Sequence, residues 1–214
     1  MPRAKRPATY HHGDLRRALV DAALPLLRSG GAEALTLRAV AREAGVSQTA
    51  PYRHFTDRAA LVAAVAEDGF RRLRGRLIAA ARAPAKTTGK AQQTARGGLQ
   101  AIALAYVRFA LEHPEEYRVM FGSEVAASPA EEGSARQEVF ALLRGGIAAL
   151  QQQGLVRQGD ASTMALSAWS LVHGLAMLAL DGQLSGSRMP SADELTLEAT
   201  GLLMFGMATP ARTS

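Results

Sequence analysis

The sequence predicts an all-α fold, with an N-terminal helix-turn-helix domain of three helices and a larger C-terminal helical domain. Apolar residues recur at the spacing of amphipathic helices over most of the chain, whereas alternating polar and apolar residues do not extend over any useful length. Clusters of Gly and Pro separate the helical runs. With 214 residues, of which 48% are apolar, the chain has room for roughly two domains.

The first helix is expected at residues 14–29, because apolar side chains follow a helical spacing there and Gly30 and Gly31 come next. Its expected buried face consists of Leu15, Leu19, Ala22 and Leu26. Asp14 stands at the N-terminal end, where the helix dipole favours a carboxylate. Pro25 lies inside the segment and is expected to bend it.

The next segment, residues 36–58, indicates two short helices around a glycine turn. Thr36 is a good N-cap for the first of them. The apolar stripe of that helix comprises Leu37, Val40, Ala41 and Ala44. Gly45 follows where the chain must reverse, since glycine tolerates positive φ at a helix C-terminus. Ser47 is the expected N-cap of the second helix. This pattern is that of a helix-turn-helix, whose second helix enters the major groove of DNA.

We therefore predict that the chain binds double-stranded DNA through the second helix. The residues expected to reach base edges are Gln48, Thr49 and Ala50. The side chains expected on phosphate oxygens are Tyr52, Arg53, His54 and Arg58. Thr36 and Ser47 complete the predicted DNA-binding set, and Phe55 is expected in the core. The alternative is that Tyr52 is also a core aromatic and that the arginines form a solvated face.

The segment resembles the DNA-binding domain of the TetR family of transcriptional repressors. The residues that match the family pattern at unbroken spacing are Thr36, Val40, Ala41, Ala44, Gly45, Val46, Ser47, Tyr52, His54 and Phe55. Pro51 stands where the family has leucine, and Asp57 and Arg58 replace its Ser-Lys pair. As the fourth residue of the helix, Pro51 is expected to remove at most one hydrogen bond. We expect a short, rigid recognition helix that ends at Phe55, with the core contact of the replaced leucine supplied from elsewhere.

Charge is distributed unevenly along the chain. Residues 1–83 contain 15 Lys and Arg against 7 Asp and Glu, whereas residues 84–214 contain 10 against 12. A basic half joined to a nearly neutral half is expected when only one domain binds nucleic acid. The N-terminal arm contributes Arg3, Lys5 and Arg6, and it either lies against DNA or acts as a solubilising tail.

The remaining elements are also expected to be helical. A connecting helix is predicted at residues 57–82. Its basic run is expected either to be solvated or to interact electrostatically with DNA at a distance. That run consists of Arg71, Arg72, Arg74 and Arg76. Loops are predicted at residues 83–98 and 122–133. Further helices are predicted at 94–113, 115–122, 134–153, 160–181 and 191–208. The predicted domains are therefore residues 1–57 with the arm and helix-turn-helix, a connecting helix at 58–82, and a second domain at 83–214.

A homodimer is expected from residues 165–180, because apolar side chains occupy nearly the whole circumference of that helix. One face would pack within the chain and another on a second copy, and together with the last helix this makes a four-helix bundle. The alternative, a fully buried helix of a monomer, is disfavoured in a domain of about 120 residues. A two-fold dimer of helix-turn-helix domains requires a palindromic operator.

The C-terminal half resembles one subgroup of the same family, through the run from Tyr106 to Gly122 and through Trp169, His173 and Gly174. The resemblance implies a second domain that binds a small-molecule effector and controls the release of DNA. The candidate lining residues, each of which also suits a plain core, are Tyr106, Phe109, His113, Met120, Phe121, Trp169, His173 and Met177. Such side chains suggest a hydrophobic or amphipathic effector.

Catalytic chemistry is not expected, because the chain has no Cys and lacks the G-x-S-x-G and glycine-rich phosphate motifs. No cofactor and no metal site are predicted, since Glu112 and His113 lack the Glu-x-x-His spacing of carboxylate-bridged metal pairs. No secretory signal and no uninterrupted apolar run of ~18 to 20 residues is seen, which predicts a cytoplasmic protein without a membrane span. A helical module that binds small molecules or partners but no operator remains the alternative, because Pro51 and Asp57 are atypical.

Overall fold

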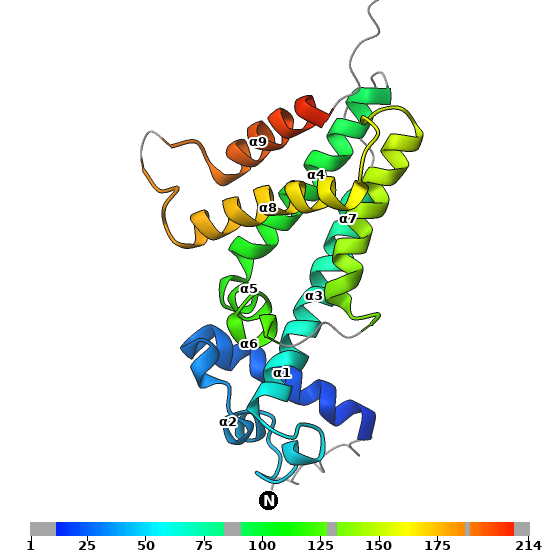
Figure 1. The fold of residues 1–214 in the computed structure, drawn as a ribbon. Coiled ribbons are helices and arrows are strands. Elements are labelled where there is room, and N and C mark those ends of the chain that lie inside the picture. The colour runs from blue at the N-terminus through cyan, green and yellow to red at the C-terminus, as the bar shows by residue number, and fades with distance from the viewer. Residues whose placement is uncertain (1–11, 84–90, 128–131, 187–188, 208–214) are drawn as a thin grey trace, which may run out of the picture.

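The computed structural model describes residues 12–83, 91–127, 132–186 and 189–207, and every regular element in these ranges is helical (Figure 1). The molecule is elongated. A small head, residues 12–57, lies at one end, and a larger body, residues 91–207, lies at the other. The helix α3, Arg58–Arg82, runs from the head into the body. The predicted all-α class with a small N-terminal and a larger C-terminal helical domain is confirmed. The basic N-terminal arm with Arg3, Lys5 and Arg6 lies outside the described residues.

The head is built from α1, His12–Gly30, a short 3₁₀ helix η1, Ala32–Ala34, and α2, Leu37–Glu43. The buried face of α1 differs from the predicted one, because its fully buried side chains are Leu19, Val20, Ala23 and Leu27. Leu15, Ala22 and Leu26 are only partly buried at the edge of that face. The buried face of α1 is determined by its packing against both α2 and α3. Helical periodicity alone predicts which side of the helix is buried, but not which residues are buried most deeply.

Two caps fix the helix starts that frame the turn region of the head. The Thr36 hydroxyl accepts a hydrogen bond from the Ala39 amide at 3.1 Å, which caps α2 as predicted. The Asp57 carboxylate accepts one from the Ala60 amide at 2.8 Å and caps α3. Asp57 is therefore the N-cap of α3. The family pattern has serine at this position, and Asp and Ser are both good N-cap residues.

The body contains six helices within its described residues. They are α4, Ala91–Glu112; α5, Pro114–Met120; α6, Ser123–Ala126; α7, Ala135–Gln152; α8, Ala161–Leu180; and α9, Ala192–Met207. Both predicted loops are wrong in part. Residues 91–98 belong to α4, and the short helix α6 occupies part of the segment 122–133. The rest of those two loops, residues 84–90 and 128–131, lies outside the described residues.

The helix α3 is the central element, since it packs on α1 in the head and on α4, α5 and α7 in the body. One apolar core follows it from Leu19 in the head to Ala176 in the body. Close packing of α3 on α5 requires Gly69, because a Cβ there would lie 2.6 Å from the Sδ atom of Met120. A continuous apolar core thus joins the head to the body. Because close-packed cores transmit strain, a displacement of the head also shifts side chains in the body.

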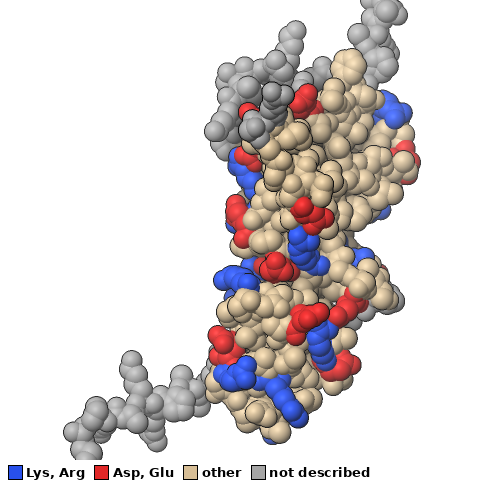
Figure 2. All heavy atoms as spheres, turned by 90° about the vertical axis from the view of Figure 1, so that its left-hand side faces the viewer, with Lys and Arg blue, Asp and Glu red and all other residues tan. Residues whose placement is uncertain are grey.

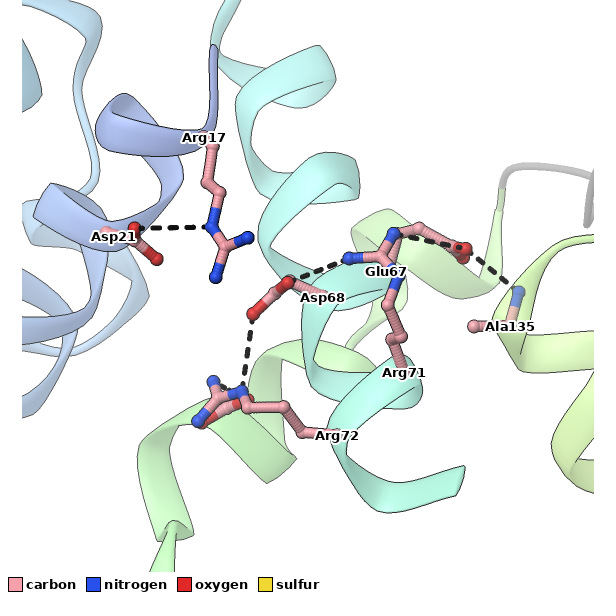
Figure 3. A network of polar contacts seen from close by, with 8 residues as sticks. Arg17, Asp21, Glu67, Asp68, Arg71, Arg72 and Ala135 are labelled. Carbon is pink, nitrogen blue, oxygen red and sulfur yellow. Dashed lines mark hydrogen bonds and ion pairs between the residues drawn. The ribbon is translucent and has the colours of Figure 1, made fainter. Parts of the chain in front are cut away.

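The arginines of the basic run of α3 form ion pairs within the chain, and the sequence did not predict these pairs. Figure 3 shows Arg71 and Arg72 directed towards Asp68, at 2.8 Å and 3.3 Å respectively. Arg72 also forms an ion pair with the buried Glu116 of α5. The Glu67 carboxylate accepts a hydrogen bond from the Ala135 amide at the start of α7 at 2.9 Å (Figure 3).

The other two arginines of the run are paired as well. Arg74 lies 3.1 Å from Glu138 of α7, and Arg76 lies 2.6 Å from Glu112 of α4. Each of these pairs is too exposed to contribute more than about 1 kcal/mol. Their geometric role is clear, because they orient α3 against three helices of the body. The run is therefore ion-paired with carboxylates of the same chain, while Arg71 and Arg76 remain exposed to solvent, as predicted.

The helices α8 and α9 leave large apolar side chains on the surface of the chain. Those with the most exposure on the two helices are Leu166, Leu178, Leu197, Leu202 and Phe205, at 51%, 46%, 39%, 69% and 85%. We call this set the α8–α9 face. A broad part of the body carries few charged side chains (Figure 2). Monomeric proteins rarely expose such a set, so this face suits contact with another molecule.

By length and composition α8 could also cross a membrane. An 18-residue window of this 20-residue helix has a mean hydropathy of 1.5, and 22% of that window is buried within the described chain. No membrane span was predicted here, because Ser, Thr and His interrupt the apolar run. These interruptions, together with the packing of α8 on α4, α7 and α9, suit a helix of a globular body.

Candidate functional site

The turn that follows α2 is the first candidate site, and it differs from the predicted recognition helix. Gly45 has the expected positive φ of 67°. After it, residues 47–50 form a turn, and a 3₁₀ helix η2 covers Pro51–Arg53. No α-helix starts at Ser47. The predicted second helix of the helix-turn-helix is thus replaced by one turn and three 3₁₀ residues.

Pro51 explains this difference. In an α-helix capped by Ser47, the residue at position 51 would donate its amide to the Ser47 carbonyl, and proline has no amide hydrogen. The Ser47 carbonyl instead accepts from the Ala50 amide at 3.0 Å, and the Arg53 amide donates to the Ala50 carbonyl at 3.2 Å. Both bonds have the shorter spacing of a 3₁₀ helix. The lost bond is the first one of the expected helix, and its loss changes the helix type.

Two further expectations about this turn are corrected. Ser47 does not cap a helix; its hydroxyl lies 3.2 Å from the Thr49 hydroxyl, and the 3₁₀ helix begins after Ala50 without a side-chain cap. Pro51 is itself buried, so it supplies the core contact that the sequence analysis assigned elsewhere. Phe55 is 2% exposed and is a core residue, as predicted.

The turn presents a polar surface at the end of the head. The exposed side chains on it are Ser47, Gln48, Thr49, Tyr52 and Arg53. Tyr52 is 54% exposed, which removes the alternative that it is a core aromatic. Ala50 and His54 are partly exposed. We call residues 47–54 the reading turn. An exposed phenol, guanidinium and amide on one short turn suit hydrogen bonds to phosphates and base edges.

Arg58 does not belong to this surface, although it was predicted to contact phosphate. Its guanidinium donates to the Ala32 and Leu35 carbonyls, at 2.7 Å and 2.9 Å, and pairs with Glu124 at 2.6 Å. All three partners lie within the protein, so the guanidinium is not available to DNA in this arrangement. Thr36 is exposed beside it, with its hydroxyl oxygen already used as the cap of α2.

The second candidate site is a cavity of about 680 Å³ inside the body. Its walls come from α3, α4, α7, α8 and α9, together with residues next to α5 and in α6. The principal lining side chains are Phe70, Leu77, Leu99, Ile102, Tyr106, Phe121, Arg136, Val139, Phe140, Leu143, Arg144, Trp169, Val172 and Leu203. Cavities of this volume with mostly apolar walls are typical of small-molecule sites.

Of the eight residues predicted to line such a cavity, Tyr106, Phe121 and Trp169 do so. The other five lie behind the wall or outside it. Phe109 and Met120 are buried in the core. His113 packs against Phe109 in a tilted arrangement, with their ring centroids 5.0 Å apart. Met177 and His173 pack against the same core from α8.

The structure adds lining residues on α7 that the sequence analysis missed, namely Arg136, Gln137, Val139, Phe140, Leu143 and Arg144. The apolar members follow the spacing of one helix face, which was visible in the sequence. Nothing in that spacing distinguishes a face turned to a cavity from one turned to a packed core.

A polar network stands at the aromatic wall of the cavity. The Trp169 indole nitrogen donates to the Tyr106 hydroxyl at 3.0 Å, and the Tyr117 hydroxyl donates to the same oxygen at 2.9 Å. The Nδ1 atom of His173 lies 3.1 Å from the Tyr106 hydroxyl and 2.7 Å from the Tyr117 hydroxyl. Every polar atom that Tyr106, Tyr117 and Trp169 bring to this wall therefore has a partner.

Burial keeps this network uncharged. It raises the pKa of Tyr106 to about 12 and raises that of Tyr117 as well. Burial also lowers the pKa of His173, which favours the neutral imidazole. With the ring neutral, hydrogen bonds through Nδ1 fix the orientation of the imidazole without placing a charge at the cavity wall.

No cluster of metal-ligating side chains is found within the described part of the chain. The most polar groups near the cavity are two phenols, an imidazole and two guanidiniums, and these include no nucleophile paired with a base in the manner of hydrolytic enzymes. The arrangement suits binding.

Comparison with known proteins gives two family matches. Residues 19–65 match a family described as bacterial regulatory proteins, tetR family, and residues 99–202 match the Tetracyclin repressor-like C-terminal domain. The first match covers most of the head with the reading turn, and the second covers the cavity walls from α4 to α9. Among curated proteins, none matches this chain.

Solved structures with the same fold span nearly the whole chain. A protein of unknown function from Rhodococcus sp. RHA1 is 36% identical, with a TM-score of 0.76, over 95% of this chain and 100% of that chain. A TetR-family transcriptional regulator from Pectobacterium atrosepticum is 20% identical, with a TM-score of 0.69, over 94% of this chain and 97% of its own. AibR, solved with isovaleryl coenzyme A and operator DNA, is 16% identical, with a TM-score of 0.57, over 89% of this chain and 96% of its own. The last two similarities show the fold alone.

Proposed function

Because this chain belongs to the TetR family of DNA-binding transcriptional regulators, we propose that it is a repressor that binds a palindromic operator as a homodimer and is released by a small hydrophobic or amphipathic effector. The observation that carries the proposal is the combination of an exposed polar reading turn on the head with a largely apolar cavity in the body. The family is one of regulators and not of enzymes, in agreement with the lack of catalytic motifs in the sequence.

Operator binding is assigned to the reading turn. Gln48 and Thr49 are exposed at its start, where side chains of a helix-turn-helix meet base edges. Tyr52, Arg53 and His54 follow and are assigned to phosphates. Charge supports this assignment, because residues 1–83 hold the excess of Lys and Arg.

Dimer formation is assigned to the α8–α9 face. Its five large apolar side chains project from two adjacent helices, and α8 and α9 pack on each other. Two copies of such a helix pair make a four-helix bundle. A two-fold axis through that bundle would place the two heads on successive turns of a palindromic operator. The dimer acts in the cytoplasm, where the operator is.

Release requires that the cavity and the head be coupled. Phe121 and Ala126, which flank Glu124 in the sequence, line the cavity. Glu124 forms an ion pair with Arg58. Arg58 in turn holds the carbonyls before α2. An effector that binds the DNA-free arrangement 100-fold more tightly than the DNA-bound one weakens operator affinity by the same factor, about 2.7 kcal/mol. AibR, solved with both a coenzyme A thioester and operator DNA, has the same fold.

The proposal is tested by incubating the purified protein with fragmented DNA of the source genome and sequencing the fragments that it retains. We expect enrichment of one inverted repeat, with affinity that falls as salt rises, by about 0.9 in log K per phosphate neutralised for each unit of log salt concentration. A variant with Tyr52→Ala and Arg53→Ala, both exposed, is expected to keep the helical spectrum and lose retention.

The alternative is a helical binding module without operator contact, and the absence of an α-helix in the reading turn is the observation that favours it. Retention of no sequence above background by the unaltered protein would establish that alternative. Retention that does not change with salt would contradict the phosphate assignments.

A further inference from the structure

We propose that the cavity takes an amphipathic anion, with its apolar part against the aromatic wall and its charged head group on Arg136. This inference rests on the proposed effector role of the cavity and specifies the chemical class of the effector. It follows from the charges on the wall, from the contacts of Arg136 and from the saturation of the aromatic polar network.

The wall of the cavity has positive charge only. Its lining residues, within the described part of the chain, include Arg136 and Arg144 and no Asp or Glu. The two arginines stand eight positions apart on α7, with Phe140 midway between them, so all three lie on one helix face. Arg144 is exposed and Arg136 is only partly exposed, which places Arg136 deeper.

Among the described residues no carboxylate pairs with Arg136, in contrast to the arginines of α3. Arg72, Arg74 and Arg76 of α3 each pair with a carboxylate of the body. Arg136 donates from Nη1 to the Val125 carbonyl at 3.2 Å, and no carboxylate lies within ion-pair distance of it among the described residues. A guanidinium has five N–H donors in a planar fork that matches a carboxylate or phosphate. A partly buried cation with donors to spare and no counterion favours an anionic ligand.

Arg144 is the less suitable ligand. It lies near the carboxylate of Asp160, whose pKa is held below its usual range mainly by hydrogen bonds from Thr163 and Ser162, with Arg144 adding the smallest share. Arg144 is also exposed, so solvent screens its charge more than that of Arg136. We assign it to the entrance, where it attracts anions, and we assign Arg136 to the head group.

The aromatic wall determines how the ligand is oriented. Tyr106 and Trp169 both line the cavity, but their polar atoms are already bonded to each other and to Tyr117 and His173. A ligand head group at this wall would have to break one of these bonds. An apolar tail breaks none, since it meets ring faces together with Phe121, Val172 and Leu203. The head group therefore lies towards α7.

The test uses the only tryptophan of the chain, because Trp169 lines the cavity and its fluorescence reports binding without DNA. Decanoate and 1-decanol are titrated into the full chain, since they share an apolar tail and differ in charge. We expect decanoate to bind at least tenfold more tightly, because its carboxylate accepts charge-assisted hydrogen bonds from the guanidinium and the alcohol does not. Decanoyl coenzyme A is a third probe, which distinguishes a free carboxylate from a phosphate-bearing carrier as the source of the anion.

Three variants locate the effect. Arg136→Gln is expected to bring decanoate and 1-decanol within threefold of each other, while the affinity for 1-decanol is retained. Arg136→Lys keeps the charge without the fork and should give an intermediate preference. Arg157→Gln is the matched control, because Arg157 is exposed and does not line the cavity. Its preference should equal that of the unaltered protein.

Equal binding of decanoate and 1-decanol by the unaltered chain, or no binding of decanoate and decanoyl coenzyme A, would overturn the proposal. So would a full preference for the anion in Arg136→Gln. If 1-decanol binding were lost together with the anion preference, the Arg136→Lys variant would decide, since restored preference requires a cationic contact. Operator retention is measured separately without ligand. Its failure, with the anion preference intact, would refute the repressor function and leave the site.

Discussion

Arg58 in the first turn of α3 and Glu124 in α6 form an ion pair of 2.6 Å between Nη1 and Oε1, and this pair joins the head of the molecule to its body. The same guanidinium holds the Ala32 and Leu35 carbonyls of the segment that leads into α2. A residue that the sequence pattern assigned to DNA phosphate is instead a structural link between the DNA-binding head and the walls of the cavity.

Removal of the Arg58–Glu124 pair should have different effects on the stability of the fold and on the coupling between effector binding and operator binding. Glu124→Gln is expected to cost no more than about 1 kcal/mol in the free energy of unfolding, because the pair is partly exposed. Arg58→Ala should cost about 1–3 kcal/mol, because two backbone carbonyls lose their donor. Urea unfolding measures both. In operator titrations, Glu124→Gln should reduce the fold by which the effector weakens DNA binding, and an unaltered fold would show that the signal takes another route.

Substitutions in the reading turn should distinguish base contacts from phosphate contacts. Gln48→Ala is expected to weaken operator binding by about 1–3 kcal/mol and to relax the preference at one base position. Tyr52→Phe removes one exposed hydroxyl and should weaken all sequences alike. Affinities for a set of single-base operator variants measure the difference. The assignments would be reversed if Tyr52→Phe changed the base preference and Gln48→Ala did not.

The α8–α9 face should control the oligomeric state. Leu202→Glu places a charge on a side chain that is 69% exposed in the chain and is expected to convert a dimer into a monomer at micromolar concentration. Leu111→Glu makes the same change at an exposed leucine of α4, outside this face, and should leave the dimer intact. Sedimentation velocity distinguishes the two species. A monomeric unaltered protein would exclude the four-helix bundle.

Acid should destabilise the body through His173. Its pKa is lowered by burial in the folded chain, so below the ordinary value of 6.5 the unfolded chain takes up a proton that the folded chain resists. Stability is therefore unaffected by this group above pH 6.5 and decreases as pH falls through the folded pKa. His173→Gln should lessen the loss of stability between pH 7 and pH 5, as measured by urea unfolding at both values.

A residual dependence on pH is expected in that variant, because other groups titrate over the same range. The pKa of His113 is also lowered, by burial and by Arg72 and Arg76, which adds to the loss in acid. Burial raises the pKa of Glu116, which has the opposite sign, since its protonation favours the folded chain. The difference between the variant and the unaltered protein isolates His173, and a difference of zero would show that its imidazole is not held neutral.

The order and type of the helices could be predicted because helical periodicity and caps are local. Thr36 caps α2 as expected, and the ends of α7, α8 and α9 lie within two residues of the predicted ones. Short elements were harder to predict from the sequence. The helix α6 has four residues, too few for any periodicity, and η2 depends on a single missing amide at Pro51.

The sequence by itself determined that the chain is helical, that its basic head contains a glycine turn followed by polar reading residues, and that α8 has an outward apolar face to cover. These properties depend on neighbours within a few turns. Only the tertiary structure decided that Arg58 binds Glu124 and two backbone carbonyls, that α7 faces a cavity, and that Arg136 has no paired carboxylate among the described residues. Partners of an arginine, and the space in front of an apolar face, are set by residues distant in the chain, and no local spacing records them.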